Sequence, residues 1–397
     1  MNILISGGWG YGNLGDDAIL HATLKLLLQI YPSANIRVLS YDPQTTEVEL
    51  NNKFLVYESV HRILFGTSAF KQLMVYNKVS DIYCKYPILD RIRNRMVYEV
   101  NRLLLHQEKK RPVLNSLQIN KLFKTADLFI MSGGGYFNNW YESLISRMEE
   151  LKLAQKYGIR HYIIGQTLDS FSAEYKEELQ SLLKNVTAIS VRDLKSHDEL
   201  ASMGIKSLVA PDLALSGFNL DKVCNTKEFG EIVFIPAELP LNCWESIVDT
   251  LSHYAKDHDI KIRIVVTRLY NSDIFQAKRC LDRFKKNKVE VKFRIPKNFK
   301  DVCEDLTQSK FVISRNLHGL ILGYVRGANV LALNDTWKFR GFMEQINASD
   351  MIVNLNNFDT LLFNSQIEKL LNQSWGIEIR RNLKDQVESN FKSILES

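Results

Sequence analysis

Short apolar runs alternate with segments of helical periodicity along almost the whole 397-residue chain, and this alternation restricts the possible folds more than any other feature. Each run leads directly into glycine or polar residues, as strands do at the carboxyl edge of a parallel sheet. In the first half the runs are NILIS (2–6), IRVLSYD (36–42), DLFIM (127–131), HYIIG (161–165), AISV (188–191) and SLVA (207–210). This order predicts an α/β protein with parallel sheets.

A second series of runs begins after the pattern lapses at about residues 216–229. These runs are EIVFIPA (231–237), IKIRIVV (260–266), VEVKF (289–293), FVIS (311–314) and VLALN (330–334). Because the chain is long enough for two cored domains, we expect one Rossmann-like domain over 1–215 and a second over 216–397. Two amphipathic helices past residue 356 should close the second domain. The two domains should face one another across a cleft, with a site that draws on both.

The composition is that of an ordinary globular chain. No apolar run approaches the roughly 18 residues of a membrane helix, and the opening MNILIS is too short for a signal peptide. We therefore expect a cytoplasmic protein. The five cysteines are scattered and never form C-x-x-C, so neither a disulfide framework nor a zinc site is indicated.

One segment carries the excess positive charge. The whole chain has a formal net charge of +6, whereas residues 60–125 hold thirteen Lys and Arg against four Asp and Glu. Apolar residues at helical spacing predict a basic helical insertion here. Its basic face could be simply solvated, could lie on the anionic inner face of a membrane, or could collect an acidic substrate. No nucleic-acid-binding motif accompanies it, so nucleic acid is not an expected partner.

A glycine-rich turn follows the first apolar run. Gly10, Gly12 and Gly15 fit the dinucleotide pattern G-x-G-x-x-G, which places a pyrophosphate on the free N–H groups of the next helix. In this chain that helix opens with Asp16 and Asp17, whose carboxylates would repel a diphosphate. The sequence therefore argues against a dinucleotide.

Two interpretations of the turn remain. An acidic residue about 20 positions past the last glycine should contact the ribose of a dinucleotide, but Asp42 lies 27 positions past Gly15. The turn could be purely structural, or it could present Asn13 and Asp16 to the hydroxyl groups of a sugar or similar polyol. A second glycine cluster, SGGGYFNNW at 132–140, includes Gly134 and Gly135 and lets a ligand or another backbone approach closely.

Charged residues gather within the stretch FVISRNLHGLILGYVRGANVLALNDTWKFRGF, residues 311–342. The strand pattern ends at Ser314 and a helix pattern begins at about Leu317, so Arg315, Asn316 and His318 should lie at the carboxyl edge of the second sheet. A helix N-terminus beside an arginine suits an anion. Lys338, after the next strand, and Arg340 should emerge on the same edge.

Two residues leave the choice between structure and catalysis open. Arg192 follows the run AISV and should point into the cleft, where it either pairs with Asp193 or Asp212 or awaits an anion. His318 could move protons near neutral pH, or it could only bond a backbone carbonyl in the first turn of its helix.

Taken together, the ordered motifs resemble the polysaccharide pyruvyl transferase family. They are GNLGDDAIL at 12–20, SGGG at 132, GQT at 165, SVRDLKS at 190, APD at 210, and SRNLHG at 314 with the later Lys338. The resemblance covers roughly residues 3–345. It implies a glycosyltransferase-B-like pair of Rossmann-like domains, phosphoenolpyruvate as the donor and no metal or bound cofactor. It also implies that the acceptor is a sugar of a cell-surface polysaccharide, or of its lipid-linked precursor, which receives a cyclic pyruvate ketal.

The resemblance also implies residue roles. The family's donor-binding arginine corresponds to Arg192, and its Leu-His pair corresponds to Leu317 and His318. The family usually has Arg immediately before Leu-His, whereas this chain has Asn316 there and Arg315 one place earlier. Such a shift near a helix start turns a side chain by about 100°.

The expected mechanism divides these residues between two substrates. Protonated His318 should deliver a proton to the methylene carbon of the donor, while Arg192, Arg315 and Lys338 hold its anionic groups. We expect the donor on the side of the C-terminal domain and the acceptor on the side of the N-terminal domain, where Asn13 and Asp16 should face it. The expected substrate-binding set is completed by Asn316, Leu317, Gly134, Gly135 and Gln166.

Three other functions remain open from the sequence. A glycosyltransferase that uses a nucleotide sugar would share the architecture. A non-catalytic protein of glycan assembly would explain Asn316 in place of arginine. A nicotinamide oxidoreductase rests on the glycine pattern alone.

Overall fold

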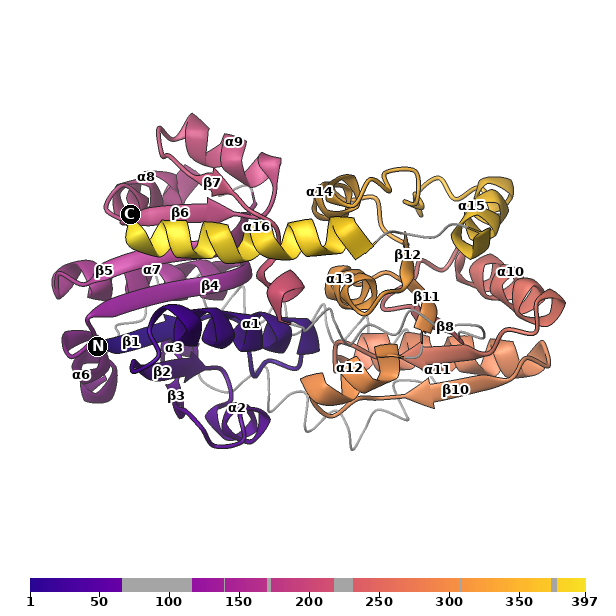
Figure 1. Ribbon diagram of the computed structural model, residues 1–397, viewed down its shortest axis with the longest axis horizontal. Helices are drawn as coiled ribbons and strands as arrows, with labels where there is room; N and C mark the ends of the chain where they lie inside the picture. The colour runs from indigo at the N-terminus through magenta and orange to yellow at the C-terminus, as the bar shows by residue number, and fades with distance from the viewer. Residues whose placement is uncertain (66–115, 139, 170–172, 218–230, 308, 373–376) are drawn as a thin grey trace.

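The computed structural model shows two α/β domains arranged along the long axis of the molecule (Figure 1). It describes residues 1–65, 116–138, 140–169, 173–217, 231–307, 309–372 and 377–397. Most of the basic segment, residues 66–115, lies outside the described residues, so its expected helical insertion and membrane contact are not addressed. No helix among the residues described is long and apolar enough to cross a membrane.

The N-terminal domain contains a seven-stranded sheet in the order β3-β2-β1-β4-β5-β6-β7, with every pair parallel. Its strands are β1 (Asn2–Ser6), β2 (Asn35–Ser40), β3 (Leu55–Glu58), β4 (Leu128–Phe137), β5 (Arg160–Leu168), β6 (Ala188–Val191) and β7 (Leu208–Val209). The six predicted runs are confirmed. The sequence analysis missed β3, a four-residue edge strand whose first residue, Leu55, is exposed.

Helices cover both faces of this sheet. Ile3 and Ile5 of β1 join the apolar core beneath α1, whereas Leu4 between them joins the core beneath α7, as the period of two in a strand requires. The helices are α1 (Leu14–Ile30), α2 (Pro43–Glu49), α3 (Val60–Phe65), α6 (Leu117–Lys124), α7 (Tyr141–Lys156), α8 (Ala173–Leu183) and α9 (Leu194–Ser202), with the 3₁₀ turn η1 (Leu213–Ser216).

The C-terminal domain contains a five-stranded parallel sheet in the order β10-β9-β8-β11-β12. Its strands confirm the second series of runs: β8 (Glu231–Ile235), β9 (Ile262–Val265), β10 (Val291–Arg294), β11 (Ser309–Ser314) and β12 (Asn329–Ala332). Its helices are α10 (Trp244–Asp257), α11 (Asn271–Lys286), α12 (Phe299–Thr307), α13 (Leu317–Val325), α14 (Trp337–Gln345) and α15 (Thr360–Asn372).

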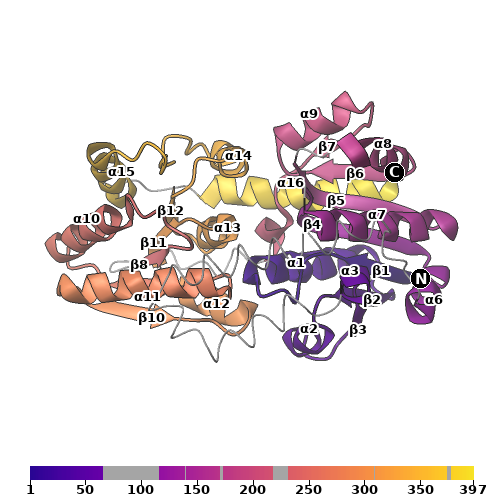
Figure 2. The same cartoon turned by 180° about the vertical axis from the view of Figure 1, so that it is seen from behind.

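The last helix departs from the expected domain boundary. The sequence analysis assigned both closing helices to the C-terminal domain, but α16 (Ile377–Glu396) returns to the N-terminal domain and packs against η1, β5, β6 and α1 (Figures 1 and 2). Leu383, Val387 and Phe391 form a buried stripe at helical spacing, which needs an apolar partner surface. This helix therefore ties the two domains together.

The glycine turn is a second tie between the domains. The N–H of Leu14 donates to the carbonyl of Thr267 (3.1 Å), and the N–H of Leu269 donates to the carbonyl of Gly12 (2.7 Å). Asn13 and Arg268 thus form an antiparallel bridge across the domain boundary. The turn is held where the two sheets meet.

Candidate active site

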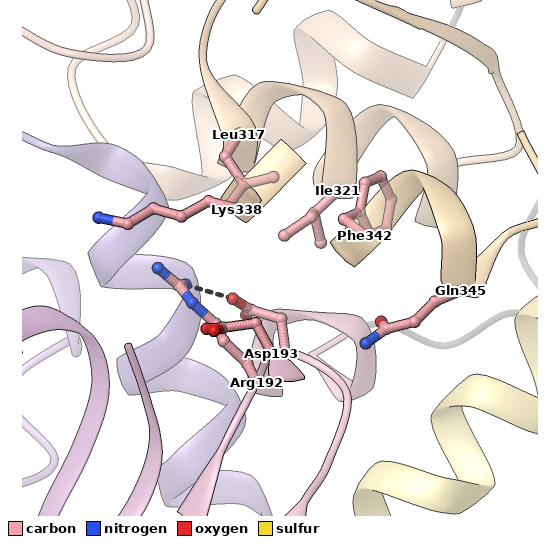
Figure 3. Close-up of a pocket in the computed structure, with 8 residues that line it drawn as sticks. Arg192, Asp193, Leu317, Ile321, Lys338, Phe342 and Gln345 are labelled. Carbon is pink, nitrogen blue, oxygen red and sulfur yellow. Dashed lines mark hydrogen bonds and ion pairs between the residues drawn. The ribbon is translucent and has the colours of Figure 1, made fainter. Parts of the chain in front are cut away.

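The carboxyl edges of the two sheets meet over a small pocket that is partly open to solvent. Its walls come from both domains: Arg192, Asp193 and Asp212 on one side, and Leu317, Ile321, Lys338, Phe342 and Gln345 on the other (Figure 3). The expected cleft is therefore present, and it brings together Arg192, Leu317 and Lys338 from the predicted set.

Arg192 lies at the end of β6 and is held by two neighbours. Its Nε donates to Thr167 Oγ1 (2.8 Å), and its Nη1 forms an ion pair with Asp212 Oδ2 (2.5 Å). Asp212 is fixed in turn because its other carboxylate oxygen accepts from the N–H of Ala214 (2.9 Å). The pairing that the sequence left open is thus with Asp212. It orients the guanidinium toward the pocket, as Figure 3 shows.

His318 reaches the same group from the other domain. Asn316 caps α13 by accepting from the N–H of Gly319 (2.9 Å), which fixes the first turn that carries the imidazole. His318 Nε2 then lies 3.4 Å from Arg192 Nη1 and 3.8 Å from Asp212 Oδ2. Asn316, expected to bind substrate, has a capping role in this structure.

The surroundings of His318 favour the neutral imidazole. Burial is the largest cause and lowers its pKa to about 4; Asp212 opposes the shift, while Arg192 and Lys338 add to it. The expected proton donor is therefore uncharged at neutral pH in this structure.

Gly15 of the glycine turn makes room for the imidazole. A Cβ atom at this position would lie 2.2 Å from His318 Nδ1, so any side chain there would displace the ring. Gly10 and Gly12 have φ angles of +76° and +82°, which strongly favour glycine. The turn thus has a structural reason for each glycine, and the third glycine serves the site directly.

Lys338 is a second cation of the pocket. In the part of the chain that the structure describes, no hydrogen bond or ion pair engages its ammonium group, which faces Gly135, where a Cβ would lie 3.3 Å from Nζ. Burial is the main cause that lowers the pKa of Lys338, and the nearby Arg192 lowers it further. Arg192 is already paired with Asp212, so Lys338 is the cation of the pocket wall that is placed to meet an anion.

Asp16 and Asn13 bond to each other at the start of α1. Asn13 accepts from the N–H of Gly15 (3.3 Å) and donates through Nδ2 to Asp16 Oδ2 (2.8 Å), and the hydroxyl of Tyr136 also bonds Asp16. Burial raises the pKa of Asp16 to about 7, which the hydrogen bond from Tyr136 and the charge of Arg192 only partly oppose. Asp16 is thus a buried carboxyl beside Arg192 that titrates near neutral pH.

Two residues of the predicted substrate-binding set hold the strand ends next to the site. Gln166 is fully buried and donates to the carbonyl of Gly133 (2.5 Å), which joins β5 to β4. Gly134 has a φ of +91°, and a Cβ there would overlap the ring of Tyr136. Both residues shape the strand ends rather than line the pocket.

Arg315 does not join the other cations, contrary to expectation. It is absent from the pocket wall, and the charges around it are those of Glu238, Arg268 and Asp273. The physical reason is the backbone: the N–H of Arg315 donates to the carbonyl of Ile235 (2.9 Å), so this residue still follows β8, whereas Asn316 already begins α13. Arg340 also does not line the pocket, because its guanidinium pairs with Asp335 at an exposed position.

The sequence analysis named Asp212 as one possible partner of Arg192, but it missed the position of Asp212 beside His318 and the contact of Arg192 with Thr167. Asp212 and Thr167 lie inside the quoted motifs APD and GQT, so the signal was present, but only the fold brings them together. No group of three or more potential metal ligands occurs among the residues that the structure places.

Two parallel α/β domains that meet over a pocket lined from both of them define a glycosyltransferase-B-like fold. Solved structures confirm the fold. The Anabaena protein Alr3699/HepE, in complex with UDP and glucose, matches with a TM-score of 0.59 at 10% identity over 100% of both chains. The UDP-GlcNAc 2-epimerase from Methanocaldococcus jannaschii matches with 0.58 at 14% identity, again over 100% of both. A glycosyltransferase from Rickettsia africae matches with 0.56 at 14% identity, over 100% of this chain and 98% of the other.

The chain belongs to the polysaccharide pyruvyl transferase family, whose model matches residues 13–335. It is therefore a transferase of polysaccharide biosynthesis, as the motifs indicated. No curated protein sequence shows significant similarity to the chain.

Proposed function

We propose that the protein transfers the pyruvyl group of phosphoenolpyruvate to a sugar of a cell-surface polysaccharide or its lipid-linked precursor. The observation that carries the proposal is that Arg192 and Lys338 line one pocket from two domains, with His318 Nε2 3.4 Å from Arg192 Nη1. Phosphoenolpyruvate carries a phosphate and a carboxylate on three carbons, and Arg192 and Lys338 are cations suited to such anionic groups.

The donor would also change the state of His318. The pKa of this imidazole is about 4, mainly because of burial, and a bound trianion would raise it by electrostatic attraction. Donor binding would therefore favour the protonated imidazole that the chemistry needs.

The reaction then balances as follows. The proton from His318 goes to the methylene carbon and leaves an oxocarbenium-like centre at C2. An acceptor hydroxyl forms an O–C2 bond, phosphate departs with the electrons of its C–O bond, and a second hydroxyl closes the ketal. Each hydroxyl releases a proton, and one of these restores His318.

Asp16 is suited to receive the other proton. It lies at the start of α1, within the electrostatic influence of Arg192, and its carboxyl is held by Asn13 and Tyr136. A carboxyl that titrates near neutral pH serves as a general base. The glycine turn would thus face the acceptor.

A direct assay tests the proposal. The protein is incubated with phosphoenolpyruvate and a panel of glycosides that present two neighbouring hydroxyls, and inorganic phosphate is followed. Acceptor-dependent phosphate release is the expected result. Its absence across the panel, together with measurable glycan binding, would favour a non-catalytic role in glycan assembly.

A nucleotide-sugar glycosyltransferase is the second candidate, because similar folds were solved with UDP. Titration with UDP- and GDP-sugars separates the two functions, since a pyruvyl transferase should not turn them over. A parallel titration with NADH tests the oxidoreductase suggested by the glycine pattern.

We also propose that the basic segment 60–125 brings the protein to the inner face of a membrane, where a lipid-linked acceptor is displayed. Sedimentation with anionic liposomes should carry the protein down at low salt and release it at high salt. Failure to bind at low salt would remove the proposal.

A further inference from the structure

The ammonium group of Lys338 lies against the ring of Trp337, a residue that the proposed reaction does not use. Lys338 Nζ is 5.1 Å from the centroid of this half-buried indole, which belongs to the first turn of α14. An ammonium group within about 6 Å of an aromatic face is attracted by its π electrons, and indole is the strongest of the aromatic partners. The ring is therefore a binding partner for the charge of Lys338.

A second ammonium group reaches the same ring from the N-terminal domain. Lys195 Nζ lies 4.7 Å from the ring centroid of Trp337, and it also pairs with Asp169 Oδ1 at 3.6 Å. Lys195 is in the first turn of α9, two residues after Asp193 of the pocket wall. Trp337 therefore connects the two domains beside the pocket.

Lys338 depends on such a contact more than Arg192 does. Arg192 is held by Thr167 Oγ1 at 2.8 Å and by Asp212 Oδ2 at 2.5 Å. For the ammonium group of Lys338, the residues that the structure places supply no hydrogen bond and no ion pair. A lysine carries a point charge on a flexible four-carbon stem, so its position is poorly defined without further contacts. The indole ring supplies such a contact.

The backbone of β4 also limits the position of Lys338. A Cβ atom at Gly135 would lie 3.3 Å from Lys338 Nζ, so a side chain there would press on the ammonium group. Figure 3 shows this group at the same end of the pocket as the guanidinium of Arg192. The ring of Trp337 and the backbone of Gly135 together define where the ammonium group meets the pocket.

We propose that Trp337 is a positioning residue for the donor, because its ring holds the ammonium group of Lys338 where an anion in the pocket can meet it. The ring acts through Lys338 and does not itself bind the donor. The inference rests on the proposed function and deepens it: the charge that receives the donor is set by an aromatic residue that also contacts Lys195 of the N-terminal domain.

Calorimetric titration of the full-length protein tests the proposal with two probes, inorganic phosphate and phosphoenolpyruvate. Trp337→Leu removes the π electrons, and we expect it to weaken the binding of both anions about tenfold. Trp337→Phe keeps a ring with a weaker attraction, so it should lose less affinity than the leucine variant. Thermal melts confirm that each variant is folded, and the phenylalanine variant keeps the test decisive if the leucine variant does not fold.

The matched control is a second pair of an indole and a cation in the same domain. The guanidinium carbon of Arg279 lies 4.3 Å from the ring centroid of Trp244, and neither residue lines the pocket. Trp244→Leu and Trp244→Phe should leave the affinity for both anions unchanged.

Two further measurements separate positioning from a general loss of structure. In the phosphate-release assay, Trp337→Leu should raise the KM for phosphoenolpyruvate and leave kcat nearly unchanged, as the loss of uniform binding predicts. An anion bound at Lys338 changes the charge beside the indole, so inorganic phosphate should shift the tryptophan emission of wild type. This shift should remain in Trp244→Phe and disappear in Trp337→Phe.

Three results would overturn the inference: unchanged anion affinity in Trp337→Leu, equal losses in Trp337→Leu and Trp337→Phe, or an emission shift that persists in Trp337→Phe. Failure of the proposed function gives a different pattern. Phosphoenolpyruvate would then neither bind to wild type nor release phosphate, whereas inorganic phosphate would still bind more weakly to Trp337→Leu than to wild type.

Discussion

Two buried arginine–carboxylate pairs in the N-terminal domain share their chemistry and differ in their surroundings. Arg147 and Glu150 on α7 are both 0% exposed, with an N···O distance of 2.7 Å. Arg192 and Asp212 lie 2.5 Å apart, with side-chain exposures of 9% and 6%. The first pair is closed on all sides, whereas the second borders a pocket.

The partners of each pair explain the difference. Arg147 also donates to the hydroxyl of Ser6 at the end of β1, and to Gly7 O and Tyr41 Oη at 3.2 Å each. The N–H groups of Arg147 therefore bind acceptors within the protein and hold the strand ends in place. Among the described residues, Arg192 forms its hydrogen bonds through Nε and Nη1. Its neighbours His318 and Lys338 belong to the other domain. A buried ion pair thus indicates a site only when part of it faces open space.

The closed pair should give the largest effect. Glu150→Ala leaves Arg147 buried without its carboxylate, and we expect a loss of about 3–5 kcal/mol in the free energy of unfolding. Denaturant titration measures it. Glu149→Ala on the same helix, where the partner Lys152 is partly exposed, should cost less than about 1 kcal/mol. Equal losses in the two variants would contradict the distinction between closed and exposed pairs.

The open pair should affect chemistry through its neighbour. His318→Ala should lower turnover at least ~100-fold, as expected for loss of a general acid, while the protein remains folded. Steady-state kinetics with phosphoenolpyruvate and a thermal melt measure the two quantities. The exposed His253→Ala is the control. Near-normal turnover in the His318 variant would remove this residue from the chemistry.

Arg192 distinguishes the open pair from the closed one, because its substitution should change donor binding more than the stability of the fold. Arg192→Lys keeps the charge but loses the fork that joins Thr167 and Asp212, so we expect the KM for the donor to rise about tenfold. The exposed Arg160→Lys should leave the KM unchanged. An unchanged KM in Arg192→Lys would show that the donor lies elsewhere.

The smallest effect concerns a buried carboxyl for which the described part of the chain supplies no ion pair. Burial, reinforced by Glu49, raises the pKa of Asp17 to about 8. The folded chain therefore keeps a proton that the unfolded chain has lost, so Asp17 contributes stability at low pH that disappears as the pH rises through about 8.

We therefore expect wild type to lose stability between pH 7 and pH 8, by on the order of 1 kcal/mol from this group. Asp17→Asn should show a smaller loss, and the exposed Asp198→Asn should behave as wild type. Denaturant titrations at the two pH values make the comparison. If wild type and Asp17→Asn lost the same unfolding free energy between pH 7 and pH 8, this carboxyl would be excluded as the cause.

The fold was largely predictable because its signals are local. Each buried strand is a short apolar run, and glycine or charged residues mark the loop that follows its carboxyl end. The edge strand β3 was missed because Leu55 is exposed and its run is short. Helix α16 was assigned to the C-terminal domain, although it packs on the N-terminal one. Its apolar stripe indicates that it must be buried against another surface, but not against which one.

The candidate site was predictable in part. Arg192, Leu317 and Lys338 followed from strand-end positions and motif resemblance, and the structure brings them together. Arg315 could not be placed, because one residue of register at the end of β11 decides whether a side chain faces the pocket or the loops after β8 and β9.

The sequence by itself determined two parallel α/β domains, their strand ends, and the residue types available there, because periodicity and turn chemistry act over a few residues. Only the tertiary structure decided that Arg192 meets His318 across 126 positions of sequence and that Gly15 makes room for the imidazole. It also decided that Arg315 turns away from both. Those distances depend on how the two domains pack, and packing is set by the fit of whole surfaces, which no short segment encodes.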